Sequence, residues 1–145
     1  METVIPKTLE ETDFFKKHGN LVEFFDSCCQ EHNGKMAFES FGVEMSYEDL
    51  SEKVNAFASW LTNNFQAGDR IAVMMPNMLA YPVIVYGALK AGIVVVNINP
   101  LYTQRELEHV LKDSETKVLV VWEGVANVVE KSNLANVETV MITTV

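Results

Sequence analysis

The stretch Arg70-Ile-Ala-Val-Met-Met-Pro76 opens the pattern that decides the fold, because it is a short apolar run stopped by a proline. A second run, Ile93-Val-Val-Val-Asn97, is β-branched and follows Gly92, as is typical of a strand. Such runs suit parallel strands that are covered on both faces. Residues 78–91 between them are long enough for a crossover helix, and Pro82 falls early enough to be tolerated in its first turn. The pattern predicts a βαβ unit in a buried parallel sheet.

The same alternation continues toward the carboxyl end of the chain. Thr103 with Glu106 predicts the start of a further helix, and an apolar run over Lys117–Trp122 predicts a third buried strand. A short helix is expected over Val125–Lys131 and a fourth strand over Val137–Thr143. Strands that alternate with helices indicate an α/β fold, with a parallel or mostly parallel sheet flanked by helices.

Three further elements are expected before this sheet. Apolar residues at helical spacing over Leu21–Cys29 predict a helix that covers one sheet face and ends near His32-Asn33-Gly34. Runs on either side of Gly42 predict a small hairpin or a bulged pair of strands. Ser46 with Asp49 then predicts a capping box at the start of a long amphipathic helix.

Composition limits the partners of this chain. Its 145 residues carry 20 acidic and 11 basic side chains, a net charge of -9, which argues against nucleic acid as a partner. The first residues lack a basic region followed by an apolar one, and Glu2 stands where a myristoylated chain has glycine, so a cytoplasmic location is expected. Adjacent Cys28 and Cys29 are expected to be free thiols, since a bridge between them would be strained.

Ligands of such sheets bind beyond the carboxyl ends of the strands, which here means the loops at Pro76-Asn77, Asn97–Thr103 and Glu123-Gly124. No glycine run that could cradle a phosphate accompanies Asn97, Asn99 and Tyr102, so these residues are expected to form turns and packing.

The charged residues outside those loops have a structural interpretation. The helix phase leaves His109 at a solvated position, and His18 and His32 lack metal-ligand spacing. Asp69 and Arg70 open the first parallel strand at the opposite edge, where structural pairing is expected.

Four segments of this region resemble the long-chain fatty acid-CoA ligases, which are AMP-forming acyl-CoA synthetases of the adenylate-forming superfamily. They are Gly68-Asp-Arg-Ile-Ala-Val-Met-Met-Pro-Asn77, Gly87-Ala-Leu-Lys-Ala-Gly92, Val96-Asn-Ile-Asn-Pro-Leu-Tyr-Thr103 and Glu106-Leu-Glu-His109. The resemblance extends over Leu21 to Val145. It implies part of the large amino-terminal domain of such an enzyme, preceded by an arm over residues 1–20 that can help dimers form.

The resemblance also implies a chemistry. In the full-length family, ATP and Mg2+ activate a fatty acid as an acyl-adenylate, and the thiol of CoA then displaces AMP. The family's motifs for that chemistry do not occur here: the Ser/Thr/Gly-rich phosphate loop with Pro-Lys-Gly, the aromatic-Gly-x-Thr-Glu segment, and the domain that bears the catalytic lysine. No catalytic, cofactor-binding or metal-binding residue is therefore assigned within these 145 residues, and the chain alone is expected to be an inactive scaffold.

Two interpretations remain open. Val140-Met-Ile-Thr-Thr-Val145 stops in or just after a strand, which favours a fragment whose gene continues. The alternative is a standalone, non-enzymatic module that uses the ligase-like scaffold for dimerisation or for binding a partner or a lipid, since an incomplete sheet leaves apolar surface for another molecule. Peripheral membrane contact suits an enzyme with fatty substrates, although no basic amphipathic helix supports it here.

Overall fold

A computed structural model describes residues 18–144, and its centre is a parallel sheet of four strands. The strand order is β4-β3-β5-β6, and the three pairings are all parallel. Arg70 lies opposite Val94 at the start of the first pairing. The predicted α/β fold is confirmed. The strands are β3 (Arg70–Met74), β4 (Val94–Ile98), β5 (Val118–Trp122) and β6 (Thr139–Thr143).

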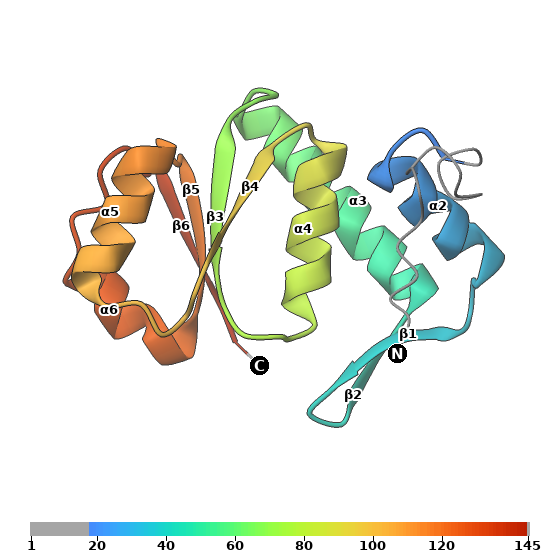
Figure 1. The fold of residues 1–145 in the computed structure, drawn as a ribbon. Coiled ribbons are helices and arrows are strands. Elements are labelled where there is room, and N and C mark those ends of the chain that lie inside the picture. Colours follow the sequence, from blue (N-terminus) through green and yellow to red (C-terminus); the bar gives the residue numbers. More distant parts are fainter. Residues whose placement is uncertain (1–17, 145) are drawn as a thin grey trace, which may run out of the picture.

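Helices cover both faces of this sheet (Figure 1). On one face lie α3 (Tyr47–Asn64) and α4 (Ala80–Lys90), and on the other lie α5 (Gln104–Ser114) and α6 (Ala126–Glu130). A short 3-10 helix, η2 (Glu123–Val125), precedes α6. Pro82 is the third residue of α4, so it lies in the first turn, as the sequence predicts.

Alternating side chains of β3 build the two cores that hold these layers together. Ile71 and Val73 pack in the core under α3 and α4, and Ala72 and Met74 pack in the core under α5. All four side chains are at most 1% exposed. Burial stabilises the fold by about 25 cal/mol per Å² of apolar surface. Because β3 buries apolar side chains in both cores, it is the centre of the fold.

A third layer lies outside α3 and α4, and it corrects one prediction. Helix α2 (Leu21–Glu31) does not cover a sheet face. Its buried Phe25 and Cys29 pack instead with Leu50 and Val54 of α3, in a cluster that contains no residue of the parallel sheet. The hairpin of β1 (Met36–Ser40) and β2 (Val43–Ser46) completes this layer and confirms the predicted hairpin. The spacing of apolar residues identified the apolar face of α2, but it did not show that this face packs against α3 instead of the sheet.

The expectation that the run at Ile93 forms a strand covered on both faces is wrong, because this strand, β4, lies at an edge of the sheet, as β6 also does. β3 and β5 are buried almost throughout. In β4, Val94 is 49% exposed and Asn97 is exposed, and in β6 Ile142 is 63% exposed. An apolar β-branched run therefore does not distinguish a central strand from an edge strand.

The predicted helix starts are confirmed. The Ser46 hydroxyl oxygen accepts a hydrogen bond from Asp49 N at 3.0 Å, and the Asp49 carboxylate accepts from Ser46 N at 3.3 Å and from the Ser46 hydroxyl at 2.6 Å. These hydrogen bonds, led by the one from the Ser46 hydroxyl, hold the pKa of Asp49 below its usual value. Together they fix the entry of α3 and bring Leu50 into the core.

Candidate functional site

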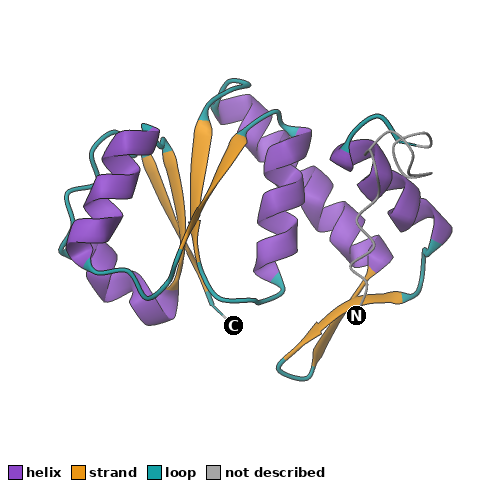
Figure 2. Ribbon diagram, in the orientation of Figure 1, coloured by secondary structure: helices purple, strands orange, loops and turns teal. Residues whose placement is uncertain are grey.

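The carboxyl ends of the parallel strands define the candidate site, since ligands of open α/β sheets bind at this edge. The connections that leave β3, β4 and β5 meet there, on the same side of the molecule as the hairpin tip (Figure 2). Thr144, the last described residue, also lies at this edge, after β6.

A hydrogen bond joins α4 to β4 at this edge. The Tyr81 hydroxyl, in the first turn of α4, donates to Asn97 Oδ1 of β4 at 3.0 Å. Tyr81 is half-buried and Asn97 is exposed. The contact holds the start of the crossover helix against the end of the strand that follows it. The Asn97 side chain therefore has a structural role at the carboxyl edge of the sheet.

The segment after β4 forms a turn, as predicted. Asn99 Oδ1 accepts from Leu101 N at 2.9 Å, and the Asn99 carbonyl accepts from Tyr102 N at 3.0 Å. The Tyr102 side chain packs against the core under α5. An Asn side chain that bonds the backbone two residues later stabilises a turn without help from a ligand.

The next helix starts from the same turn. The Glu106 carboxylate accepts from Thr103 N at 2.8 Å and from the Thr103 hydroxyl at 2.7 Å, which confirms the predicted pairing of these residues. The bond from the Thr103 hydroxyl is the main cause that lowers the pKa of Glu106. This carboxylate is therefore ionised at neutral pH and is occupied by its own helix start.

At the end of β5, Trp122 lies over Gly124. A Cβ at Gly124 would lie 2.3 Å from the Trp122 ring, so only glycine fits there. The Trp122 ring packs against the core under α3 and α4, and its buried Nε1 has no hydrogen-bond partner among residues 18–144. The Trp122 side chain is therefore half-buried at the carboxyl edge.

An apolar groove of about 410 Å³ lies beside the carboxyl edge. Its walls come from the β3–α4 connection, the outer side of α4, β1 and the start of α2. They include Leu21, Phe38, Met78, Leu79, Pro82 and Val85. A second hollow of about 80 Å³ shares Met78 and Leu79 with it and adds Phe41, Val43 and Thr144. We call the two together the hairpin groove.

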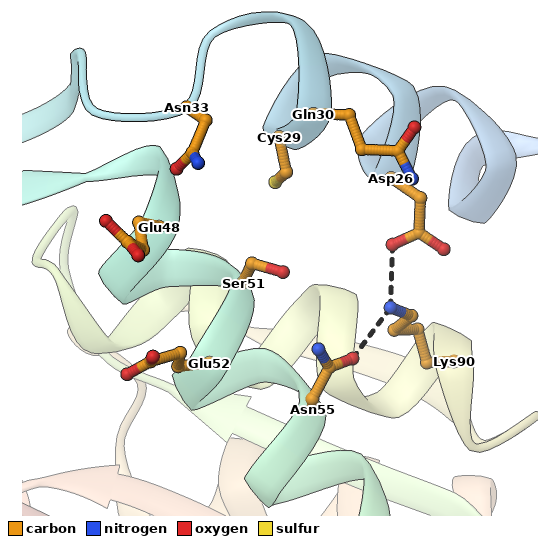
Figure 3. Close-up of a pocket in the computed structure, with 9 residues that line it drawn as sticks. All are labelled: Asp26, Cys29, Gln30, Asn33, Glu48, Ser51, Glu52, Asn55 and Lys90. Carbon is orange, nitrogen blue, oxygen red and sulfur yellow. Dashed lines mark hydrogen bonds and ion pairs between the residues drawn. The ribbon is translucent and has the colours of Figure 1, made fainter.

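A separate hollow of about 410 Å³ lies between α2 and α3 and is lined by polar side chains (Figure 3). Lys90 reaches it from α4, where its Nζ lies 2.6 Å from Asp26 Oδ1 and 2.8 Å from Asn55 Oδ1. Cys29 lines the same hollow, and burial, followed by the nearby Asp26 charge, raises the pKa of its thiol. A thiol that stays protonated and a carboxylate that forms an ion pair with Lys90 suit a structural junction of three helices.

The three histidines lie apart from one another. His109 is exposed, as predicted, while His18 is buried beside the Phe24 ring and His32 lies near the Tyr47 ring. Residues 18–144 contain no cluster of three His, Cys, Asp or Glu side chains that could hold a metal ion. No helix in this part of the chain is long and apolar enough to cross a membrane.

Charges at the opposite edge of the sheet pair structurally, as expected. Lys117 Nζ lies 2.9 Å from Asp69 Oδ1, and Arg70 Nη1 lies 3.4 Å from Glu115 Oε2. A hydrogen bond from Gln66 N, and then the one from Lys117, lower the pKa of Asp69. These pairs tie the start of β3 to the start of β5.

Sequence reasoning missed the Tyr81–Asn97 contact and the hairpin groove. The first joins residues from different elements and leaves no periodic signal. The second does have one: Phe41 stands beside Gly42 at a hairpin turn, where Asn or Asp is usual, and Phe38 and Val43 are also apolar and exposed. An exposed aromatic residue at a position where hairpin turns usually have a polar one indicates a surface that another segment or molecule can cover.

Comparisons with known proteins identify close relatives. The long-chain-fatty-acid--CoA ligase of Haemophilus influenzae is 41% identical over 128 residues, which are 87% of this chain and 23% of the relative. The ligase of the same name from Yersinia pestis is 42% identical over 117 residues, 79% of this chain and 21% of the relative. The resemblance to fatty acid-CoA ligases is thereby confirmed.

Solved structures agree in fold. A fatty acyl CoA synthetase from Mycobacterium tuberculosis has a TM-score of 0.78 at 26% identity, over 86% of this chain and 26% of that one. The anthranilate CoA ligase AuaEII, in complex with anthranoyl-AMP, has a TM-score of 0.80 at 22% identity, over 86% of this chain and 25% of that one, a likeness in fold alone.

The chain thus spans about a quarter of the length of these fatty acid-CoA ligases. The AMP-binding enzyme family matches residues 25–145, which include all of the parallel sheet. The chain therefore belongs to the AMP-binding enzyme family.

Proposed function

We propose that this chain is the amino-terminal segment of an ATP-dependent, AMP-forming fatty acid-CoA ligase. The observation that carries the proposal is the identity of 41% to the ligase of Haemophilus influenzae, over 87% of this chain. The substrates would be a fatty acid, ATP and CoA. The cytoplasm is the proposed location.

The reaction of such an enzyme has two balanced steps. The fatty acid carboxylate attacks the α-phosphorus of ATP, and pyrophosphate leaves. The CoA sulfur then attacks the acyl carbon, the thiol proton passes to a base, and AMP leaves with the electron pair of the broken bond. Adenylation is needed because a carboxylate is a poor acceptor for a thiol.

We assign a scaffold role to the described residues. The polar groups at the carboxyl edge are engaged locally: Asn97 with Tyr81, Asn99 with its own turn, and Glu106 with Thr103. Residues 18–144 contain no cluster of carboxylate, His or Cys side chains that could hold Mg2+. The isolated chain should therefore bind and orient neither nucleotide nor metal by itself.

A graft tests the proposal. The chain replaces the matching 128-residue region of the Haemophilus influenzae ligase, and the purified chimera is assayed for acyl-CoA formation from a fatty acid, ATP and CoA. The chimera should be active and the isolated chain inactive. A folded chimera without activity, or acyl-CoA formation by the isolated chain, would contradict the proposal.

A second candidate is a standalone module that binds another copy or another partner. Exposed apolar side chains such as Phe41 and Ile142 favour it, because water-exposed apolar surface promotes association. Sedimentation of the isolated chain across a range of concentrations tests this reading. A defined dimer supports the module, whereas heterogeneous aggregation favours a segment that lacks its covering surface.

A further inference from the structure

The hairpin turn holds an aromatic residue in an unfavourable backbone conformation. Phe41 has φ 53° and Gly42 has φ 78°, so both central residues of the turn lie in the left-handed region. Glycine adopts this region freely, and Asn adopts it more readily than Phe. Phe41 is also 75% exposed. The turn therefore combines an unfavourable backbone conformation with an exposed ring, although the Glu39 carboxylate accepts a hydrogen bond from Gly42 N at 2.7 Å.

Other apolar side chains of the hairpin extend the same surface. Phe38 is 42% exposed and Val43 is 57% exposed, and both line the hairpin groove. The groove floor comes from buried Met78 and half-buried Leu79. Bulky apolar groups around an apolar floor suit a partner surface that is itself apolar.

The position of Thr144 indicates what covers this surface. Thr144 lines the smaller hollow together with Phe41, Val43 and Met78. Polypeptide that follows position 144 must therefore start beside the hairpin. The matched region is only 23% of the Haemophilus influenzae ligase, and in the proposed amino-terminal position most of the enzyme would follow position 144.

We propose that the hairpin groove is the seat of the polypeptide that follows position 144 in a full-length enzyme of this family, with Phe41 as its central anchor. The inference rests on the proposed place of the chain within a longer enzyme, but not on the acyl-CoA chemistry. Aromatic anchors in well-packed pockets commonly dominate such interfaces.

The substitution Phe41→Asn separates this role from ordinary stability. In the isolated chain it should raise the unfolding midpoint by about 3 °C, because Asn-Gly relieves the strained turn. In the chimera with the Haemophilus influenzae ligase it should lower the midpoint, because the anchor is lost. Val94→Thr is the matched control: Val94 is 49% exposed on β4, outside the groove, and its effect should have the same sign in both proteins.

Hydrogen exchange provides a readout that needs no substitution. Amides of residues 38–43 should exchange at least about tenfold more slowly in the unmodified chimera than in the isolated chain. Equal exchange, or a stabilising Phe41→Asn in the chimera, would overturn the inference. Protection in the isolated chain that rises with its concentration would also overturn it, since a second copy would then be the occupant. A chimera that cannot fold counts against it too, because the surfaces would not match.

The outcomes for this inference and for the proposed function are distinguishable. A chimera that protects the hairpin but forms no acyl-CoA keeps the inference and rejects the function. A chimera that forms acyl-CoA while the hairpin amides still exchange rapidly supports the proposed function and rejects the inference.

Discussion

Lys90 Nζ lies 2.6 Å from Asp26 Oδ1, and this ion pair joins the last residue of α4 to the middle of α2. The same ammonium bonds Asn55 Oδ1 of α3 at 2.8 Å and lies 5.7 Å from the centre of the Phe25 ring. One side chain of α4 thus joins α2 of the outer layer to the two helices, α3 and α4, that cover the sheet (Figure 3). The Lys90 side chain is only 18% exposed, so solvent screens its contacts less than those of a surface lysine.

Replacement of Lys90 should loosen this junction. Lys90→Met keeps most of the apolar stem but removes the ion pair and the bond to Asn55. Asp26 is 41% exposed, which discounts the electrostatic loss, so the free energy of unfolding should fall by about 1 kcal/mol. Urea denaturation measures it. Lys131→Met, at an exposed lysine, is the control, and an equal effect of both substitutions would show that Lys90 has no special role.

Gly87 should not tolerate a methyl group. A Cβ there would lie 2.7 Å from Phe57 Cδ1 and 3.3 Å from Val54 O, where α4 crosses α3. Gly87→Ala should therefore reduce the free energy of unfolding by about 1–3 kcal/mol, although Ala is the better helix former. In a Phe57→Ala background the cost should shrink by more than half, as a double-mutant cycle would measure. Stabilisation by Gly87→Ala would refute the close approach.

The cap at Ser46 should contribute measurably to stability. Ser46→Ala removes the hydroxyl that bonds Asp49 N and the Asp49 carboxylate, and should lower the free energy of unfolding by about 1 kcal/mol. Ser59→Ala, at an exposed position within the same helix, should have a much smaller effect. Thermal unfolding of both variants gives the comparison, and similar losses would mean that the cap is not the cause.

Asp69 should make the chain acid-sensitive. Its pKa is lowered in the folded state, so its stabilising contribution is present above the ordinary value of 3.8 and is lost as pH falls through the lower folded value. Asp69→Asn should therefore be less stable than the parent at pH 7, and the difference should disappear at strongly acidic pH. Exposed Asp113→Asn is the control. A difference that persists in acid would assign the effect to packing instead of charge.

Cys29 should react slowly while the chain is folded. Burial and the Asp26 carboxylate raise the pKa of its thiol, which disfavours the nucleophilic thiolate. In a Cys28→Ala variant at pH 8, alkylation by iodoacetamide should be at least about tenfold slower in buffer than in urea. Mass spectrometry of timed samples follows the reaction. Equal rates in the two solvents would show that Cys29 is accessible.

Local patterns predicted most of the elements correctly. The apolar runs at Ile71 and Val118, the capping pairs and the turn at Asn99 each depend on neighbours within a few residues, and the structure confirms them. The parallel orientation of the strands also followed, because helices of sufficient length separate the runs, although their order in the sheet did not.

Relations between distant elements could not be predicted in this way. The apolar stripe of α2 has the same appearance whether it meets a sheet or, as Phe25 does, another helix. The exposure of Val94 depends on which strand lies beside β4, and no residue in that strand encodes its edge position. The hairpin groove depends on surfaces from α2, α4 and β1, which the fold alone brings together.

The position of β3 between β4 and β5 has a consequence for biosynthesis. When β4 has left the ribosome, β3 gains its first neighbour, but its other edge stays open until β5, which ends at residue 122, has left the ribosome too. At ordinary rates of translation this interval lasts on the order of 1–5 s. During that time the nascent chain presents one of its most apolar strands, Arg70–Met74, with half its backbone groups unpaired. Chaperones that act at the ribosome exit would meet this protein within that interval, before its sheet can close.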